Sequence, residues 1–450
     1  MEIGKLHVSC VDTDTILDME IAAGVNRHAA LKLTCIVACD KAQRYVSLAE
    51  PQEPLILTEG STVLFHGVVE KAVCKIQKDY ALLELTAMSG SIRLDKEKKT
   101  MSYQDITMTC GEIIGTKTSC MYYPQDNSIG TIALQYMETD WAFIQRMAAK
   151  NSQCIYPDMT RNPDLVLCGI DTARPEKEIH VLRERMEKDM EKERTTYVLD
   201  SDTFLTVGDA IRHDGQKLYV HALTCTMDKA GFHAVYRARR AEDITCEPVE
   251  LYDMAGAALE GKIIAVQGEK VKVHLNVDAQ QPLDTAYWFP FSTMQSASDG
   301  SGWYYMPEEG DCVKVCIPGW EETGAFAVSA VSTYTGEDDT EDRMSDTNTK
   351  YMRNPSGKEL KLTPDSIRAD GGASASVLGM DTAGKVTLSA RKELRFIAED
   401  TIQLVAEQNI EMQASKTIDI KADTTGELLL NEEGEIRQLG GQVNINSENE

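Results

Sequence analysis

The residues of this 450-residue chain best suited to bind a metal or to move a proton are its eight histidines. None of them stands at metal-ligand spacing from a second histidine or from a cysteine, so we expect no metal site and no bound cofactor. We interpret His66 as a core histidine with a hydrogen-bond partner rather than a catalytic one. His274 is the last histidine, so the C-terminal segment offers no histidine pair that could hold a metal ion at its own end.

The spacing of the twelve cysteines also argues against a metal-binding or redox-active cysteine pair. Only the pairs Cys35/Cys39 and Cys312/Cys316 have four-residue spacing, and no Cys-x-x-Cys pair occurs. We therefore expect reduced, half-buried thiols and assembly in the cytoplasm.

Aspartate and glutamate are abundant, but nothing in the sequence separates a catalytic pair from solvated charge. We name no catalytic, cofactor-binding or metal-binding residue, and we expect that the protein is not an enzyme.

The charge balance excludes several classes of partner. Lysine and arginine number 46 against 72 aspartates and glutamates, which gives a net charge of −26. Such an excess opposes binding to phosphate backbones and to anionic lipid headgroups, so we expect no nucleic-acid partner. The N-terminus lacks the pattern of a signal peptide, and no apolar run is long enough to span a membrane.

A repeat of eight residues occupies the C-terminal part of the chain. Residues 385–424 divide without gaps into KVTLSARK, ELRFIAED, TIQLVAEQ, NIEMQASK and TIDIKADT. The second, fourth and sixth positions of every octad are apolar, and the sixth is always alanine. These positions are Val386, Leu388, Ala390, Leu394, Phe396, Ala398, Ile402, Leu404, Ala406, Ile410, Met412, Ala414, Ile418, Ile420 and Ala422.

The period of the repeat predicts how these side chains are buried. Alternation gives each short strand one apolar face, and the polar positions between strands supply a corner. One chain of such octads would leave its sheet edges exposed, whereas three intertwined chains can close a triangular prism around the fifteen positions. We favour this trimeric β-helix. A single-chain β-solenoid with three octads per turn stays open as the alternative.

The remaining patterns divide the chain into further segments. We predict a mainly β hub over 1–250, with helices near 141–150 and 175–194. Five short strands over 256–333 are typical of a small oligonucleotide/oligosaccharide-binding (OB) barrel. An acidic linker over 334–358 and the octad-repeat spike over 359–450 follow.

Four motifs carry a resemblance to a known family. They are FHGVV at 65–69, YQDIT at 103–107, QYMETDWAFIQR at 135–146 and MPEEGDCVKV at 306–315. These segments resemble the hub half and the OB barrel of type VI secretion spike proteins of the valine–glycine repeat family (VgrG) and of contractile phage baseplate hubs. The order of hub, barrel and octad shaft is similar over most of the chain. Two features depart from the family: the shaft lacks valine–glycine repeats, and the charged segment 175–194 has no counterpart that we can carry over.

The resemblance implies a function and a set of partners. It implies two tandem barrels in the hub, threefold packing of the OB domains, and a homotrimeric spike of a contractile injection system that punctures the target envelope mechanically. The implied partners are the inner tube protein, baseplate subunits, a separate PAAR-like tip protein and carried effectors. The particle would assemble in the cytoplasm, join the baseplate and be ejected from the cell. The alternatives are a phage tail hub with wall-degrading activity and a β-solenoid fibre or adhesin.

Overall fold

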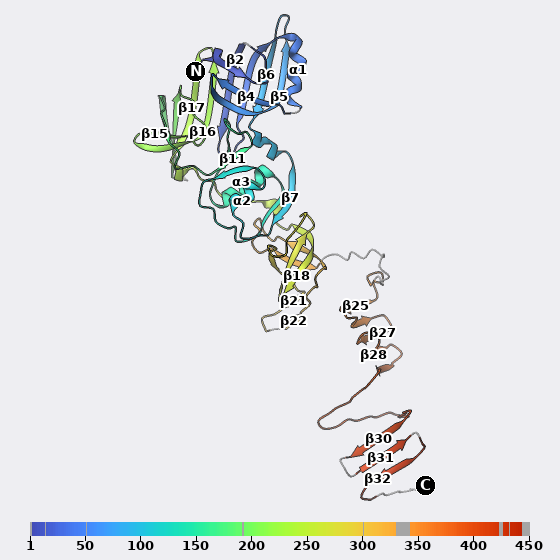
Figure 1. Ribbon diagram of the computed structural model, residues 1–450. Coiled ribbons are helices and arrows are strands. Elements are labelled where there is room, and N and C mark those ends of the chain that lie inside the picture. The colour runs from blue at the N-terminus through green and yellow to red at the C-terminus, as the bar shows by residue number, and fades with distance from the viewer. Residues whose placement is uncertain are drawn as a thin grey trace. The chain divides into compact units, whose positions relative to one another are not determined.

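The protein divides into two compact units, Met1–Ser332 and Thr333–Glu450. The structure is a computed structural model, drawn as a ribbon in Figure 1. It describes residues 2–13, 15–50, 52–190, 193–299, 301–329, 343–422, 426–431 and 433–442. Strands dominate both units, which confirms the predicted mainly β class.

A twelve-stranded sheet with two six-stranded halves forms the largest part of the first unit (Figure 1). The first half has the order β1–β4–β5–β6–β3–β2. Its strands are β1 (Leu6–Val8), β2 (Thr15–Gly24), β3 (Ala30–Val37), β4 (Pro54–Glu59), β5 (Thr62–Ile76) and β6 (Ala81–Met88). The second half contains β12 (Glu176–Lys177), β13 (Val181–Asp189), β14 (Arg194–Ser201), β15 (Ala210–His213), β16 (Gln216–Asp228) and β17 (Gly231–Arg239).

The two halves are hydrogen-bonded to each other through β2 and β16, from the pair Gly24–Ala222 to the pair Met19–Met227. Inward-facing residues alternate along the strands, and those of both halves join one apolar core. The tandem barrels that the resemblance implies are therefore two halves of one continuous sheet. Hydrogen bonds between the described strands close neither half into a barrel.

Two of the three described α-helices lie in the segment between the halves. These are α2 (Cys110–Gly115) and α3 (Asp140–Lys150), whereas α1 (Ala42–Val46) lies between β3 and β4 of the first half. Short 3-10 helices occur at Ile3–Lys5, Cys39–Lys41, Ser47–Ala49, Gly90–Asp95, Ala241–Asp243 and Tyr252–Met254. Helix α3 confirms the helix predicted near 141–150. It begins after Thr139, whose side chain accepts a hydrogen bond from the backbone N–H of Ala142. The strands here are β7 (Lys98–Tyr103), β8 (Ser119–Tyr122), β9 (Ala133–Thr139), β10 (Ile155–Pro157) and β11 (Leu165–Cys168).

The prediction of a helix near 175–194 is wrong. The described part of this segment forms β12 and the edge strand β13. Strand β13 pairs with β14 from Val181, opposite Ser201, to Asp189, opposite Arg194. Strand pairing supplies the hydrogen bonds of one edge, and the charged side chains are tolerated because most residues of β13 are exposed on both faces of the sheet. An ion pair between Glu187 and Arg237 of β17 further stabilises the strand.

A five-stranded sheet of the OB type completes the first unit, with the order β20–β19–β18–β23–β24. A parallel bridge between Phe291 and Ala327 links the end of β20 to β24 and brings the two outer strands together. Strand order and bridge agree with the predicted OB fold. The strands are β18 (Ala258–Gln267), β19 (Lys270–Leu275), β20 (Trp288–Pro290), β23 (Cys312–Cys316) and β24 (Phe326–Ser329), with the hairpin β21 (Gln295–Ser296) and β22 (Gly302–Trp303) between β20 and β23.

The second unit contains two antiparallel meanders. The first is β25 (Lys350–Arg353), β26 (Glu359–Leu362), β27 (Ser366–Asp370), β28 (Ser376–Asp381) and β29 (Val386–Ala390); the second is β30 (Thr417–Ala422), β31 (Gly426–Asn431) and β32 (Ile436–Leu439). Strand β25 lies inside the predicted linker 334–358, of which 334–342 falls outside the described residues. Residues 391–416, all described, contain no strand.

Candidate functional site

The octad positions are exposed in the single chain. Thirteen of the fifteen predicted core positions are exposed, Ile418 is half-buried, and the side chain of Ala422 lies outside the described residues. Leu404 is 70% exposed and Phe396 is 64% exposed. An exposed apolar stripe of this length is typical of a surface that another chain covers. The structure places the predicted residues along one segment and leaves thirteen of their side chains uncovered within the described part of the chain.

Strand pairing is restricted to the two ends of the repeat. The first octad forms β29, which pairs with β28, and the last forms β30, which pairs with β31. The three octads between them, 393–416, have no strand partner among the described residues. Backbone N–H and C=O groups of an extended segment require partners, so this segment presents both unpaired backbone and apolar side chains.

A second feature is the joint between the hub and the OB domain, which lie in one compact unit. The apolar core of the OB domain includes Ile132 and Leu134, which belong to the hub segment at β9. The side chain of Gln104 spans the joint: its Nε2 donates to the carbonyl of Val273 at 3.0 Å, and its Oε1 accepts from the N–H of Tyr287 at 3.1 Å. The joint is thus built from apolar packing and from hydrogen bonds of a buried amide.

Buried charges form the centre of this joint. Arg146 of α3 contacts Glu138 at 2.5 Å and Glu322 of the β23–β24 loop at 3.0 Å, and all three side chains are buried. Lys150, one turn after Arg146, contacts the other oxygen of Glu322 at 2.9 Å. Glu322 also accepts a hydrogen bond from the N–H of Leu134. Two cations and a backbone donor therefore surround one carboxylate.

The pKa of Glu322 follows from these contacts. Burial raises this pKa, but Lys150 and Arg146 outweigh the burial and lower it to about 2. Asp140 behaves similarly: burial raises its pKa, while hydrogen bonds from Lys99, Gln135 and Lys117 lower it below its ordinary value. Neighbouring cations therefore favour the ionised form of Glu322 and of Asp140. Such clusters are also found at catalytic sites, but every group here is used in a structural contact.

Two of the four sequence motifs supply residues of the joint. YQDIT supplies Gln104, and QYMETDWAFIQR supplies Glu138, Asp140 and Arg146. Sequence reasoning missed Glu322, because a buried glutamate cannot be told from a solvated one in a chain so rich in acidic residues. Its only sequence signal is its position in a loop within the predicted OB domain.

His66 is half-buried in β5, and its backbone N–H donates to the carbonyl of Met159 at 2.7 Å. The fold does bring His213 near Glu184 and Asp214, with ligand atoms within 4.8 Å of one another. Within this group, the Nε2 atom of His213 lies 2.7 Å from a carboxylate oxygen of Glu184. No helix in the described residues is long and apolar enough to cross a membrane.

Comparisons with known proteins show the fold. No protein-family model matches the chain, and no curated protein matches it either. The structure of the E. coli c3393 protein is similar, with a TM-score of 0.53 and 12% identity over 72% of this chain and 99% of that one. That protein is described as a type VI secretion component with structural similarity to the T4 bacteriophage tail proteins gp27 and gp5.

Chains of two PdpA–VgrG complexes are also similar. The half-lidded Francisella complex matches with a TM-score of 0.51 and 9% identity over 83% of both chains. The lidless complex matches with a TM-score of 0.50 and 9% identity over 83% of this chain and 93% of that one. The chain therefore has the fold of VgrG-like spike and hub proteins.

Proposed function

We propose that this chain is the central hub and spike of a contractile injection system, and that it works as a homotrimer. The fold of the first unit and the octad repeat of the second support this together. The observation that carries the proposal is the exposed apolar stripe from Val386 to Ile420 on a chain whose hub has a spike-protein fold. Three chains that intertwine over this stripe bury it and pair its backbone.

The trimer would form a stiff, narrow shaft suited to mechanical puncture of a target envelope. The fifteen octad residues are its proposed core. We propose that the hub caps the inner tube and contacts baseplate subunits, and that a separate PAAR-like protein forms the tip. The complexes of PdpA with VgrG support the proposal that this chain also carries effectors. Assembly in the cytoplasm, followed by ejection with the particle, completes the proposal.

An enzymatic role finds less support. The E. coli c3393 protein, which has a matching fold, is described as a component of the type VI secretion system, and its description names no enzymatic activity. The charged clusters of the first unit are used in structural contacts. We propose that the chain hydrolyses nothing, and that incubation of the purified protein with peptidoglycan releases no soluble fragments.

The experiment that tests the proposal is the mass of the purified chain in solution. Each chain has a mass of 49.9 kDa, so light scattering should give about 150 kDa for three chains. A truncated variant that ends before residue 359 should lose most of this association, because the proposed core is then missing. A monomer of the full chain with a folded tail would contradict the proposal and favour a single-chain solenoid.

A further inference from the structure

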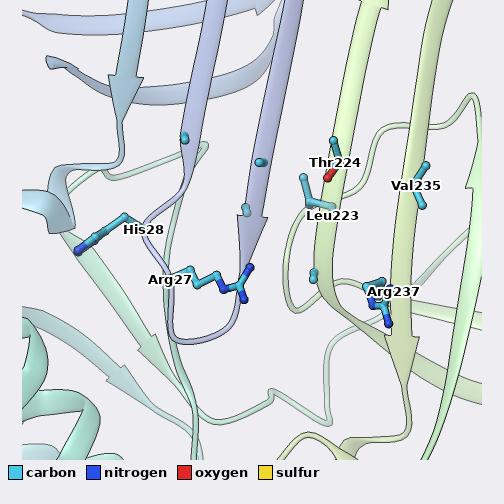
Figure 2. Close-up of a pocket in the computed structure, with 10 residues that line it drawn as sticks. Arg27, His28, Leu223, Thr224, Val235 and Arg237 are labelled. Atoms are coloured by element: carbon cyan, nitrogen blue, oxygen red, sulfur yellow. The ribbon is translucent and has the colours of Figure 1, made fainter. Parts of the chain in front are cut away.

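A cavity of about 320 Å³ lies on the hub sheet at the seam between its two halves (Figure 2). Small side chains from β2, β3 and β16 make much of its wall, namely Ala22, Ala23, Ala30 and Ala222. Arg27, in the loop between β2 and β3, and Arg237 of β17 supply the charge. No acidic side chain lines the cavity. The seam therefore presents two guanidinium groups above a surface that a polypeptide could approach closely.

The two arginines lack sufficient negative charge. Arg27 is exposed and has no ion pair among the described residues. Arg237 contacts Glu187, but the same carboxylate also contacts Arg185 at 2.9 Å. One carboxylate therefore serves two guanidinium groups, and a third has none. The other titratable residue of the wall, His28, already has partners. Its Nδ1 is hydrogen-bonded to Ser91 at 2.8 Å, and its ring lies against Trp141.

Further arginines lie close to the pocket and act on a buried histidine beside it. His221 precedes Ala222 in β16, is only 8% exposed, and its Nε2 has no hydrogen-bond partner among the described residues. Burial, followed by Arg239 and Arg237, lowers the pKa of His221 to about 3. The pKa of Arg239 is lowered by burial and by Arg194 and Arg237 as well. A local cationic field in a chain of net charge −26 is unusual and favours an anionic occupant.

We propose that this seam pocket binds carboxylate side chains of an acidic protein segment, with Arg27 and Arg237 as the cationic groups that hold them. A guanidinium binds a carboxylate through two parallel hydrogen bonds, so two arginines select a planar anion. The alanine wall favours a peptide, because its small side chains let a second backbone lie along the strands. The net charge of the chain disfavours a nucleic acid as the source of the anion.

Fluorescence anisotropy of fluorescein-labelled hexaglutamate, titrated with the full-length chain at low salt, tests this proposal. The wild-type chain should bind the probe, and Arg27→Gln or Arg237→Gln should weaken binding about tenfold each, because a charge-assisted hydrogen bond is lost. Arg44→Gln is the matched control, since Arg44 is an exposed arginine on α1 outside the cavity, and it should leave affinity unchanged.

Two further probes separate the possible sources of the anion. Labelled hexaglutamine should not bind, and free citrate should displace hexaglutamate only at much higher concentration. Equal affinity of the Arg27→Gln and Arg44→Gln variants, or no binding by the wild-type chain, would overturn the proposal. Displacement of labelled hexaglutamate by citrate at the same concentration as the peptide would also overturn the proposal. The pocket would then be a site for a small free anion. Circular dichroism of each variant shows whether the fold is retained.

Discussion

Arg146 of α3 and Glu322 of the β23–β24 loop form a buried ion pair at 3.0 Å although 176 residues separate them in sequence. The pair joins the segment between the hub halves to the OB domain. Both partners have further contacts, Glu138 for Arg146 and Lys150 for Glu322. A largely buried cluster of ion pairs and hydrogen bonds of this kind favours one orientation of the two domains.

Removal of the carboxylate of Glu322 should destabilise the first unit. In Glu322→Gln the buried guanidinium of Arg146 loses one counter-charge, and breaking a buried pair in this way costs roughly 3 kcal/mol. Urea unfolding followed by tryptophan fluorescence measures the change. Glu321→Gln is the matched control, because Glu321 is exposed and adjacent, and its substitution should change the free energy of unfolding by less than about 0.5 kcal/mol. Equal effects of the two substitutions would contradict the structural role of Glu322.

The stability of the first unit should fall in acid through the same carboxylate. The pKa of Glu322 is about 2 in the folded chain against an ordinary value of 4.5, so its contribution is complete above pH 4.5 and is lost as pH falls from 4.5 towards 2. The shift corresponds to about 3 kcal/mol. Melting temperatures of the wild type and Glu322→Gln should converge over this range. A constant difference between the two melting temperatures from pH 5 to pH 2 would show that ionisation of Glu322 does not cause the loss of stability in acid.

Gly67, in the FHGVV motif, should not tolerate a side chain. A Cβ at this position would lie 2.2 Å from the carbonyl oxygen of Met88, which is backbone and cannot move aside easily. Gly67→Ala should therefore lower the free energy of unfolding by about 2 kcal/mol or more. Gly4→Ala, where nothing lies within 4 Å, is the control and should be close to neutral. A wild-type melting temperature for Gly67→Ala would mean that β5 and β6 are farther apart than described.

How much of the fold follows from the sequence depends on how far apart in the chain the interacting residues lie. Helix α3 was predictable because its cap, Thr139, and its apolar face are local in sequence. The OB strands were predictable because each alternates within a few residues. The segment of β13 was mistaken for a helix, since its charged residues favour helices and only pairing with β14 makes it a strand. The joint was not predicted as such, because the burial of Glu322 depends on contacts with Arg146 and Lys150, both far away in the chain.

The proposed shaft makes the sharpest prediction, because the same substitution should have a large effect at one residue and none at the next. Leu404 occupies the fourth octad position and should face the interior of the trimer, whereas Val405 should face solvent. Leu404→Asp places a carboxylate in a dry interior and should cost several kcal/mol per chain, with loss of the 150 kDa species on heating or dilution. Val405→Asp is the matched control, since Val405 is also apolar, is 79% exposed in the single chain, and should leave mass and melting temperature unchanged. If the two variants behave alike, or if only Val405→Asp dissociates, the apolar octad positions do not line the interior of a three-chain shaft.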